Sequence, residues 1–237
     1  MIALGNVIKS YRPDFIALQE VTSELLPLIL QQKWAHEYFV SDTSGKHLES
    51  YGNVMLSRVS FKECVLHKLE SRLGRKAMLG NFMVSGFPNV VMGTFHLESY
   101  LEDAPYRASQ LKTLQRLTET FPNVILVGDT NFTSDEESSA LGDRFSDAWK
   151  VLYQSTPEAA SHNKGLTFDT ETNSMAKEEY LSHNMQDPKS VRLDRCFFTH
   201  QTLEPLEMKI LGQEPYMDQE YISDHYGIFI RLKLKPQ

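Results

Sequence analysis

Short apolar segments of the strand type recur along most of this 237-residue chain, and only a few helical patterns separate them. Five such segments follow one another between residues 36 and 97, as expected of an antiparallel meander. Three more lie near the end of the sequence, at residues 191–198, 206–212 and 226–234. Strands interleaved with a few helices predict an α/β fold in which two packed sheets carry helices on their outer faces.

The helical patterns are short, and the first of them precedes every strand. Apolar spacing predicts helices over residues 4–11, 25–30 and 103–121, whereas the polar segment 153–190 predicts long loops plus a short helix. A buried strand begins at Phe15, directly after the first helix. Because a helix that leads into a strand normally completes a crossover from an earlier parallel strand, we expect one strand to be absent from this sequence.

Composition and charge limit the class of protein. A hydrophobic content of 41% is ample for one large core, so we expect a single domain over residues 1–237. The formal charge of −7 excludes a global basic field, and any polyanion site must be a local patch. Cys64 and Cys196 are too few for a disulfide framework, and no segment is typical of a signal peptide or a membrane span. We expect a soluble intracellular monomer, in the nucleus or cytoplasm.

Polar residues collect at the ends of strands. Five segments, IALQE, VMGTFHLES, VILVGDTN, VRLDR and ISDHYGIFI, place ionisable or amide groups beside or inside an apolar strand. Such groups are expensive to bury unless they are paired, bound to a metal or open to a cleft, so the five ends are expected to form one site. The candidate residues are Glu20, His96, Asp129, Asn131, Asp194, Asp224 and His225.

The candidate set is rich in hard oxygen ligands and contains no thiolate, which favours Mg²⁺ or Mn²⁺ over structural zinc. Magnesium is usually held by one or two carboxylates plus substrate phosphate, so a single strong protein ligand would suffice. The two histidines could instead belong to a zinc or non-haem iron site, although no HxxxH or HxD spacing supports one.

Each candidate residue also has a structural interpretation. Gly128-Asp129 is by itself a common turn signal, Asp194 could pair with Arg195, and Asp224 could cap a turn. The coincidence of five similar strand ends favours a functional site over these separate interpretations.

The motifs LQEV, GDTN, LDR and SDH, in this order and at these separations, resemble the exonuclease-endonuclease-phosphatase superfamily. Three further stretches, FHLES at 95–99, YRASQLK at 106–112 and TFDTETN at 167–173, look like its tyrosyl-DNA phosphodiesterase branch. The resemblance covers residues 14–234. It implies a four-layer α/β/β/α sandwich with two packed mixed sheets, and a Mg²⁺-dependent phosphodiesterase that removes tyrosyl or similar adducts from DNA ends.

The resemblance also implies a role for each residue of the metal and water site. Glu20 would bind the metal, with Asp224 supporting the metal site through water. Asp129 and Asn131 would orient and deprotonate the attacking water.

The remaining roles concern charge and substrate. Asp194 would keep His225 charged, so that its imidazolium, together with His96, neutralises the charge that develops in the transition state. The substrate side would include Ser99 of the HLES motif, Arg107 as a phosphate contact, and Phe168 as a stacking platform for a terminal base or sugar.

The sequence departs from the family pattern at its start. Family members begin with a strand that ends in an asparagine near the scissile phosphate, and this sequence starts after it. The resemblance therefore agrees with the helix that has no preceding strand. Alternatives left open are an abasic-site endonuclease, a deadenylase, a lipid or inositol phosphatase, and a catalytically weakened binding protein.

Overall fold

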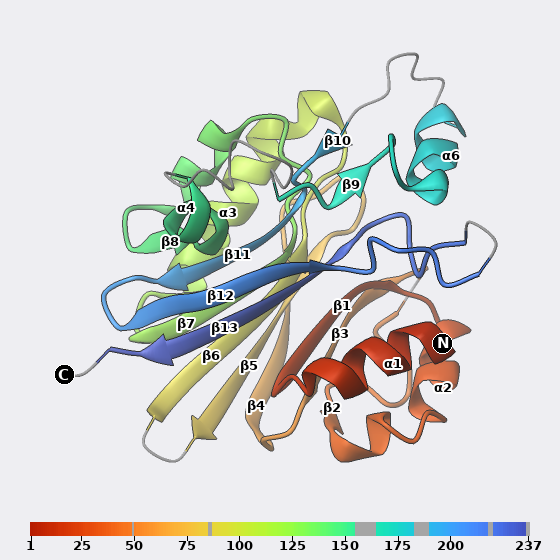
Figure 1. Cartoon of the computed structure of the whole chain (residues 1–237). Coiled ribbons are helices and arrows are strands. Elements are labelled where there is room, and N and C mark those ends of the chain that lie inside the picture. The colour runs from red at the N-terminus through yellow and green to blue at the C-terminus, as the bar shows by residue number, and fades with distance from the viewer. Residues whose placement is uncertain (49, 85–86, 155–164, 183–189, 218–219, 236–237) are drawn as a thin grey trace.

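The computed structural model describes residues 1–48, 50–84, 87–154, 165–182, 190–217 and 220–235 (Figure 1). Its elements, in chain order, are α1 (Ile2–Tyr11), β1 (Phe15–Val21), α2 (Leu25–Leu30), η1 (Ala35–Glu37), β2 (Phe39–Val40), β3 (Gly52–Ser57), β4 (Phe61–Lys68), β5 (Lys76–Val84), β6 (Phe87–His96), η2 (Leu101–Asp103), α3 (Ala104–Thr118), β7 (Asn123–Asp129), η3 (Asp135–Leu141), β8 (Phe145–Asp147), α4 (Ala148–Tyr153), β9 (Phe168–Asp169), α6 (Ser174–Ser182), β10 (Ser190–Val191), β11 (Asp194–Thr199), β12 (Leu203–Leu211) and β13 (Gly227–Leu234).

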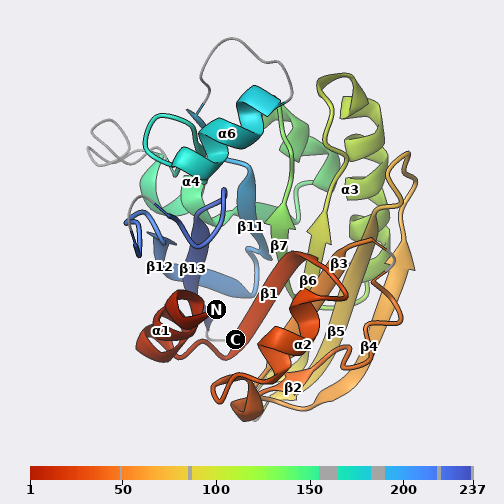
Figure 2. The same ribbon diagram turned by 90° about the vertical axis from the view of Figure 1, so that its right-hand side faces the viewer.

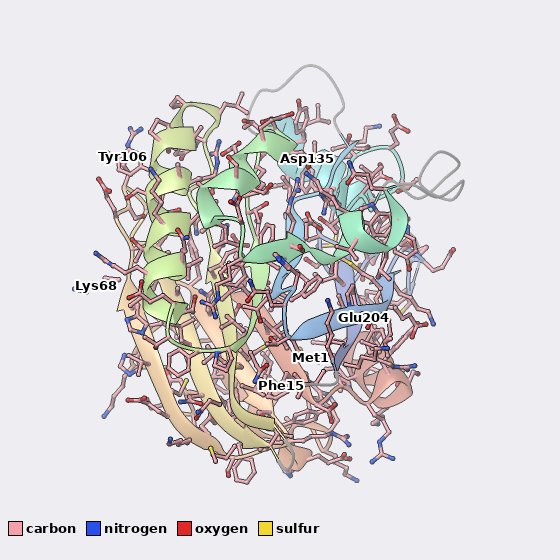
Figure 3. The ribbon with its side chains drawn as sticks, turned by 90° about the vertical axis from the view of Figure 1, so that its left-hand side faces the viewer. Met1, Phe15, Lys68, Tyr106, Asp135 and Glu204 are labelled. Atoms are coloured by element: carbon pink, nitrogen blue, oxygen red, sulfur yellow. The ribbon has the colours of Figure 1, made fainter. Side chains whose placement is uncertain are left out.

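A six-stranded mixed sheet forms one side of the sandwich. Its strand order is β4-β5-β6-β7-β11-β8, and β6 runs parallel to β7 while the other neighbours are antiparallel. The outer face of this sheet is covered by α3 and η3, which Figure 3 shows from that side. Leu111 and Leu114 of α3 are fully buried against this face. The parallel pair β6–β7 places two strand ends at the same edge of the sheet.

The facing layer is divided into two pieces. One piece is antiparallel with the order β1-β3-β2, and the other is the antiparallel pair β12-β13. Figures 1 and 2 show both pieces on the same side of the six-stranded sheet, with α1 and α2 outside the first. β1 and β13 are not hydrogen-bonded to each other, and among the described residues each pairs along one side only, so each has one free edge.

A channel of about 570 Å³ lies between these two free edges. Side chains of β1, β13 and α1 form its walls, and Met92 and Val127 of the six-stranded sheet form its floor. The channel also reaches Glu20, Asp194 and His225. The residues that line the channel are mostly apolar along the strands β1 and β13, and they are polar at the ends of these strands.

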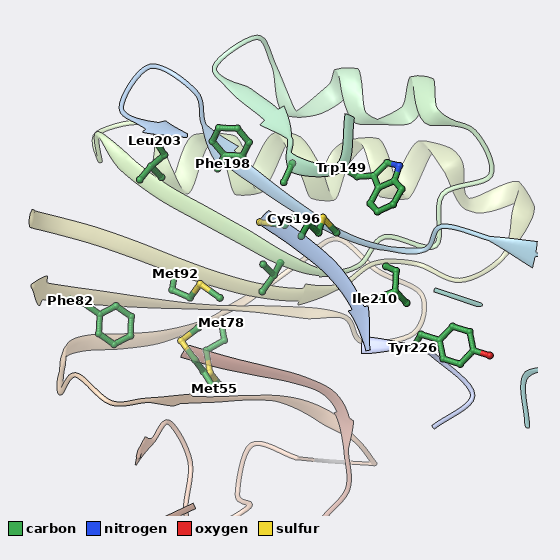
Figure 4. Close-up of a cluster of buried hydrophobic side chains, with 13 residues drawn as sticks. Met55, Met78, Phe82, Met92, Trp149, Cys196, Phe198, Leu203, Ile210 and Tyr226 are labelled. Atoms are coloured by element: carbon green, nitrogen blue, oxygen red, sulfur yellow. The ribbon is translucent and has the colours of Figure 1, made fainter. Parts of the chain in front are cut away.

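One core cluster lies between the two layers (Figure 4). Met78, Phe82 and Cys196 of the six-stranded sheet pack there with Met55 of β3 and Ile210 of β12. The core therefore joins both pieces of the divided layer to the continuous sheet, although the two pieces do not pair with each other.

The predicted α/β/β/α class is confirmed, with one difference of detail. Only the six-stranded sheet is mixed, because both pieces of the facing layer are antiparallel. The predicted opening helix is α1, and the short helix expected in the polar segment is α6. Residues 155–164 and 183–189 of that segment lie outside the described residues. No helix in the described part of the chain is long and apolar enough to cross a membrane.

Candidate active site

Three of the candidate side chains form a row across the six-stranded sheet. His96, Asp129 and Asp194 are register partners on β6, β7 and β11. Residues in register on neighbouring strands project from the same face, and this face is the one that meets the divided layer. His96 Nε2 lies 3.4 Å from Asp129 Oδ2, and both residues are buried. Register alone therefore brings together three groups that lie far apart in the sequence.

The turn after β7 explains the glycine and the asparagine of the GDTN motif. A side chain at Gly128 would collide with the backbone carbonyl of Phe95, so only glycine fits this close approach. Asn131 has a left-handed φ of 49°, and its backbone N–H donates to Asp129 Oδ1 at 2.8 Å. The Asn131 side chain donates to the carbonyl of Leu97 at 3.1 Å. These bonds orient the carboxylate and the amide toward the same edge.

His225 and Asp194 form a close pair between the two layers. His225 Nδ1 lies 2.8 Å from Asp194 Oδ2. Burial by itself would lower the pKa of His225, but the Asp194 carboxylate, with Asp129 and Asp224 nearby, raises it to about 10. With a pKa of about 10 the imidazole carries a positive charge at neutral pH, which is the charge state that the family resemblance implies.

The pKa shift of Asp129 suits a proton acceptor, and the pKa shift of His96 suits a neutral hydrogen-bond donor. Burial and the neighbouring Asp194 raise the pKa of Asp129 above its ordinary value. Burial, Arg75 and His225 lower the pKa of His96 well below its ordinary value. The family resemblance implies that His96 helps to neutralise the negative charge of the transition state. A neutral imidazole brings no positive charge to that task, so its contribution is a donated hydrogen bond.

Glu20 projects from a bulge at the end of β1. The pairing of β1 with β3 shifts register between Leu18 and Val21, and Glu20 has a φ of 56°. Its Oε1 lies 3.7 Å from His96 Nδ1. Loss of solvation in the cleft and then repulsion from Asp224 raise the pKa of Glu20, so two carboxylates face the same space.

The donors around Glu20 suit a hard divalent cation. No group of three or more His, Cys, Asp or Glu residues that could hold a metal occurs within the described ranges. Magnesium needs only one or two protein carboxylates when water and phosphate complete its shell. A divalent cation bound here would relieve the mutual repulsion of Glu20 and Asp224, and this repulsion is the observation that supports a metal at this place.

Arg75 is a residue of this region that the sequence did not indicate. It is 5% exposed, and its guanidinium donates to Tyr51 Oη at 2.9 Å and to Ser99 Oγ at 2.5 Å. It also lies 3.2 Å from His96 Nδ1, which leaves the proton of the neutral ring on Nε2. A basic residue in a turn is normally exposed to solvent, so the sequence gives no sign that Arg75 belongs to the site. Its burial in the structure gives that sign.

Two predicted substrate residues have different surroundings from those expected. Arg107 is completely buried, and it forms an ion pair with Glu137 of η3 and donates to the carbonyls of Glu98 and Tyr100. Arg107 does not face the site, because its carboxylate partner Glu137 belongs to η3, which lies on the outer face of the six-stranded sheet. The Phe168 ring is buried and packs at 5.2 Å, centroid to centroid, against His225 rather than lying open for stacking. Ser99 does lie in the site, where it also meets Asn131.

Comparison with known proteins identifies the family. The model of the Endonuclease/Exonuclease/phosphatase family matches residues 1–225. The chain belongs to this family. A curated zebrafish (Danio rerio) protein, tyrosyl-DNA phosphodiesterase 2, is 27% identical over 238 residues, which cover 95% of this chain but only 60% of that protein. The chain therefore spans less than two thirds of this curated relative.

Solved structures show the same fold in the family. The crystal structure of D. rerio TDP2 complexed with single-strand DNA product has a TM-score of 0.79 and 24% identity, and the match covers 97% of this chain and 90% of that one. The crystal structure of TDP2 from C. elegans has a TM-score of 0.75 and 24% identity, covering 98% and 68% of the two chains. The resemblance to the tyrosyl-DNA phosphodiesterase branch thus extends over nearly the whole chain.

Proposed function

We propose that this member of the Endonuclease/Exonuclease/phosphatase family is a Mg²⁺-dependent phosphodiesterase that hydrolyses a tyrosyl or similar adduct from a DNA terminal phosphate. The row of His96, Asp129 and Asp194, with charged His225 on Asp194, is the observation that carries the proposal. A buried base, a neutral donor and a cation at one edge form a set that can attack and stabilise a phosphodiester. Similarity to the curated zebrafish enzyme supports the DNA-adduct substrate.

Asp129 is the proton acceptor in this mechanism. Its raised pKa makes it a stronger base than an exposed aspartate, and Asn131 is oriented beside it to align the attacking water. His225 donates to a phosphate oxygen as an imidazolium, and His96 adds a neutral Nε2–H. Positive charge and hydrogen bonds are thereby directed to the oxygens on which negative charge develops.

The metal side of the site rests on two carboxylates. Glu20 would hold Mg²⁺, with Mn²⁺ as an alternative, and Asp224 would support it through water. When bound, the cation supplies Lewis-acid polarisation of the phosphoryl oxygen. Ser223 donates to Asp224 Oδ1 at 3.0 Å, which orients that carboxylate.

A cavity of about 120 Å³ next to His96 suits the adduct. Its lining includes Tyr51, Arg75 and Lys76, so it combines an aromatic ring with cationic groups. A phenolate leaving group carries negative charge on an aromatic ring, and both properties match this lining. The acidic net charge favours recognition of a DNA end over coating of a duplex.

A 5′-phosphotyrosyl oligonucleotide tests the proposed function directly. We expect release of tyrosine in Mg²⁺ or Mn²⁺ and none with a chelator. Parallel reactions on abasic DNA, poly(A) and a phosphoinositide identify the other branches of the family. Cleavage of one of those substrates, with the tyrosyl oligonucleotide untouched, would reject the proposed substrate.

The divided layer favours a second candidate, a binding protein with weakened catalysis. Such a protein would bind the tyrosyl oligonucleotide without turnover in any divalent metal. Fluorescence anisotropy of labelled oligonucleotide, measured beside the cleavage assay, separates binding without hydrolysis from absence of binding.

A further inference from the structure

Glu98 is a buried carboxylate that the proposed mechanism does not use. It follows β6, and none of its surface is exposed. Oε1 accepts from the backbone N–H groups of Arg72 and Leu73 at 2.8 and 2.9 Å. Oε2 accepts from Ser71 Oγ at 2.7 Å and from Gln110 Nε2 at 3.1 Å. Three of the four donors belong to one turn, the segment that joins β4 to β5.

The same turn positions Arg75. Ser71 Oγ, which donates to Glu98, accepts from the backbone N–H of Arg75 at 2.8 Å. The carbonyl of Arg75 accepts from the Leu69 N–H at 3.1 Å, which closes the turn. Glu98 is therefore joined to the Arg75 backbone through one hydroxyl group.

Arg75 has the character of a group directed at a ligand. No carboxylate among the described residues forms an ion pair with it, and its buried Nε–H has no hydrogen-bond partner. Its guanidinium faces the cavity beside His96 and contacts that ring and Ser99. The carboxylates of Glu20 and Asp129 interact with Arg75 only at longer range, and a buried cation without a direct ion pair is costly, so its position must be imposed by its surroundings.

We propose that Glu98 is a positioning residue that acts through Ser71 to place the Arg75 guanidinium over His96 and Ser99, where it meets the substrate. The proposal rests on the proposed function for the identity of the substrate, but not for the order of the turn. A purely structural role would instead make Glu98 an anchor between β6 and α3, through its bonds to Gln110 and Arg107.

Two properties of the contacts favour positioning over anchoring. The carboxylate directs three of its four bonds to the turn and one to α3. In addition, the Glu98 backbone already joins α3 through its N–H to Gln110 Oε1 and its carbonyl to Arg107. The helix would remain attached without the carboxylate, whereas the turn would lose its main acceptor.

Hydrogen exchange of Glu98→Gln tests the order of the turn without any substrate. The amide replaces one acceptor oxygen by a donor, so we expect the N–H groups of Arg72, Leu73 and Arg75 to exchange about tenfold faster or more. Unchanged exchange in the turn, with faster exchange in α3, would show that Glu98 is an anchor and would overturn the proposal.

A double-mutant cycle with Arg75→Ala tests the link to catalysis. On a p-nitrophenyl phosphodiester or the tyrosyl oligonucleotide, we expect Glu98→Gln to lower kcat/KM about 10- to 100-fold. It should change the same parameter, kcat or KM, as Arg75→Ala does. In the Arg75→Ala background, Glu98→Gln should have no further effect. Additive losses would overturn the proposal.

Asp103→Asn is a matched control for loss of a buried carboxylate near the same turn. Asp103 is 1% exposed and pairs with the side chain of Arg72, but not with the turn backbone. We expect near wild-type kcat/KM whatever its effect on the melting temperature. Ser71→Ala serves if Glu98→Gln does not fold, and it should give the same non-additive loss. If no substrate is cleaved by the wild type, the proposed function fails while the exchange measurement still decides the role of Glu98.

Discussion

The two layers of strands differ in continuity, and each contributes a different half of the candidate site. The six-stranded sheet is unbroken and carries His96, Asp129 and Asp194 in register. The facing layer is divided between β1 and β13, and these two strands flank the channel beside Glu20 and His225. The residue proposed to accept the proton thus lies on the continuous sheet, whereas the proposed metal ligands lie in β1 and in the segment before β13.

This difference shows which residues of the site have their spacing fixed by backbone hydrogen bonds. Strand pairing sets the spacing of the three residues in the row, because each has a hydrogen-bonded neighbour strand. Glu20 and Asp224 lie on opposite sides of a gap, and no strand pairing joins them. Their separation is therefore expected to respond to metal and to packing in the channel far more than the row does.

The largest expected effect is on the continuous sheet. Asp129→Asn removes the proton acceptor while keeping the shape of the side chain, and we expect kcat to fall about 10²- to 10⁴-fold. Circular dichroism and melting temperature should remain close to wild type, because Asn131 N–H keeps an acceptor. A variant that retains most of the wild-type kcat would remove Asp129 from the mechanism.

The loss of stability on truncation of an apolar side chain should also differ between the two layers, and this effect is smaller than that of Asp129→Asn on kcat. Leu126→Ala empties a fully buried position of the six-stranded sheet, so we expect a loss of about 2–5 kcal/mol in unfolding free energy. Leu18→Ala removes a side chain that lines the channel, where contacts are already lacking on one side, and should cost only about 1 kcal/mol. Urea unfolding of both variants makes the comparison, and equal losses would show that the channel is packed.

Glu20→Gln separates metal use from stability. We expect the Mg²⁺ concentration needed for half-maximal activity to rise about 10- to 100-fold. Metal-free stability should be unchanged or higher, because the substitution removes repulsion between Glu20 and Asp224. An unaltered Mg²⁺ requirement in activity assays would exclude Glu20 as a ligand.

The pH dependence of kcat should show the smallest effects, at most about tenfold per pH unit. The rate rises with pH as Asp129 loses its proton, and its raised pKa places that rise above the usual range for aspartate. The rate falls again only as pH approaches the pKa of His225, about 10, where the imidazolium is lost. A fall that begins near pH 6.5 would mean that His225 is not held charged by Asp194.

Sequence reasoning reached the elements whose signals are local. The apolar runs and their polar ends predicted that Glu20, Asp129 and Asp194 belong to one region, and the structure places Asp129 and Asp194 in register and Glu20 in the channel that also reaches Asp194. The placement of Arg75 and Arg107 was out of reach because both depend on partners far along the chain. Arg107 meets Glu137 only through the packing of η3 on α3, and Arg75 reaches His96 only through the register of β5 with β6.

The central claim, that the two layers bring separate halves of one phosphodiesterase site together, is tested most directly by a crystal structure with Mn²⁺ and a 5′-phosphorylated oligonucleotide. We predict an anomalous peak bound by Glu20, with Asp224 linked through water, and the terminal phosphate between this ion and His96, Asp129 and His225. An ion bound elsewhere, or a phosphate that contacts none of the three residues of the row, would contradict the account.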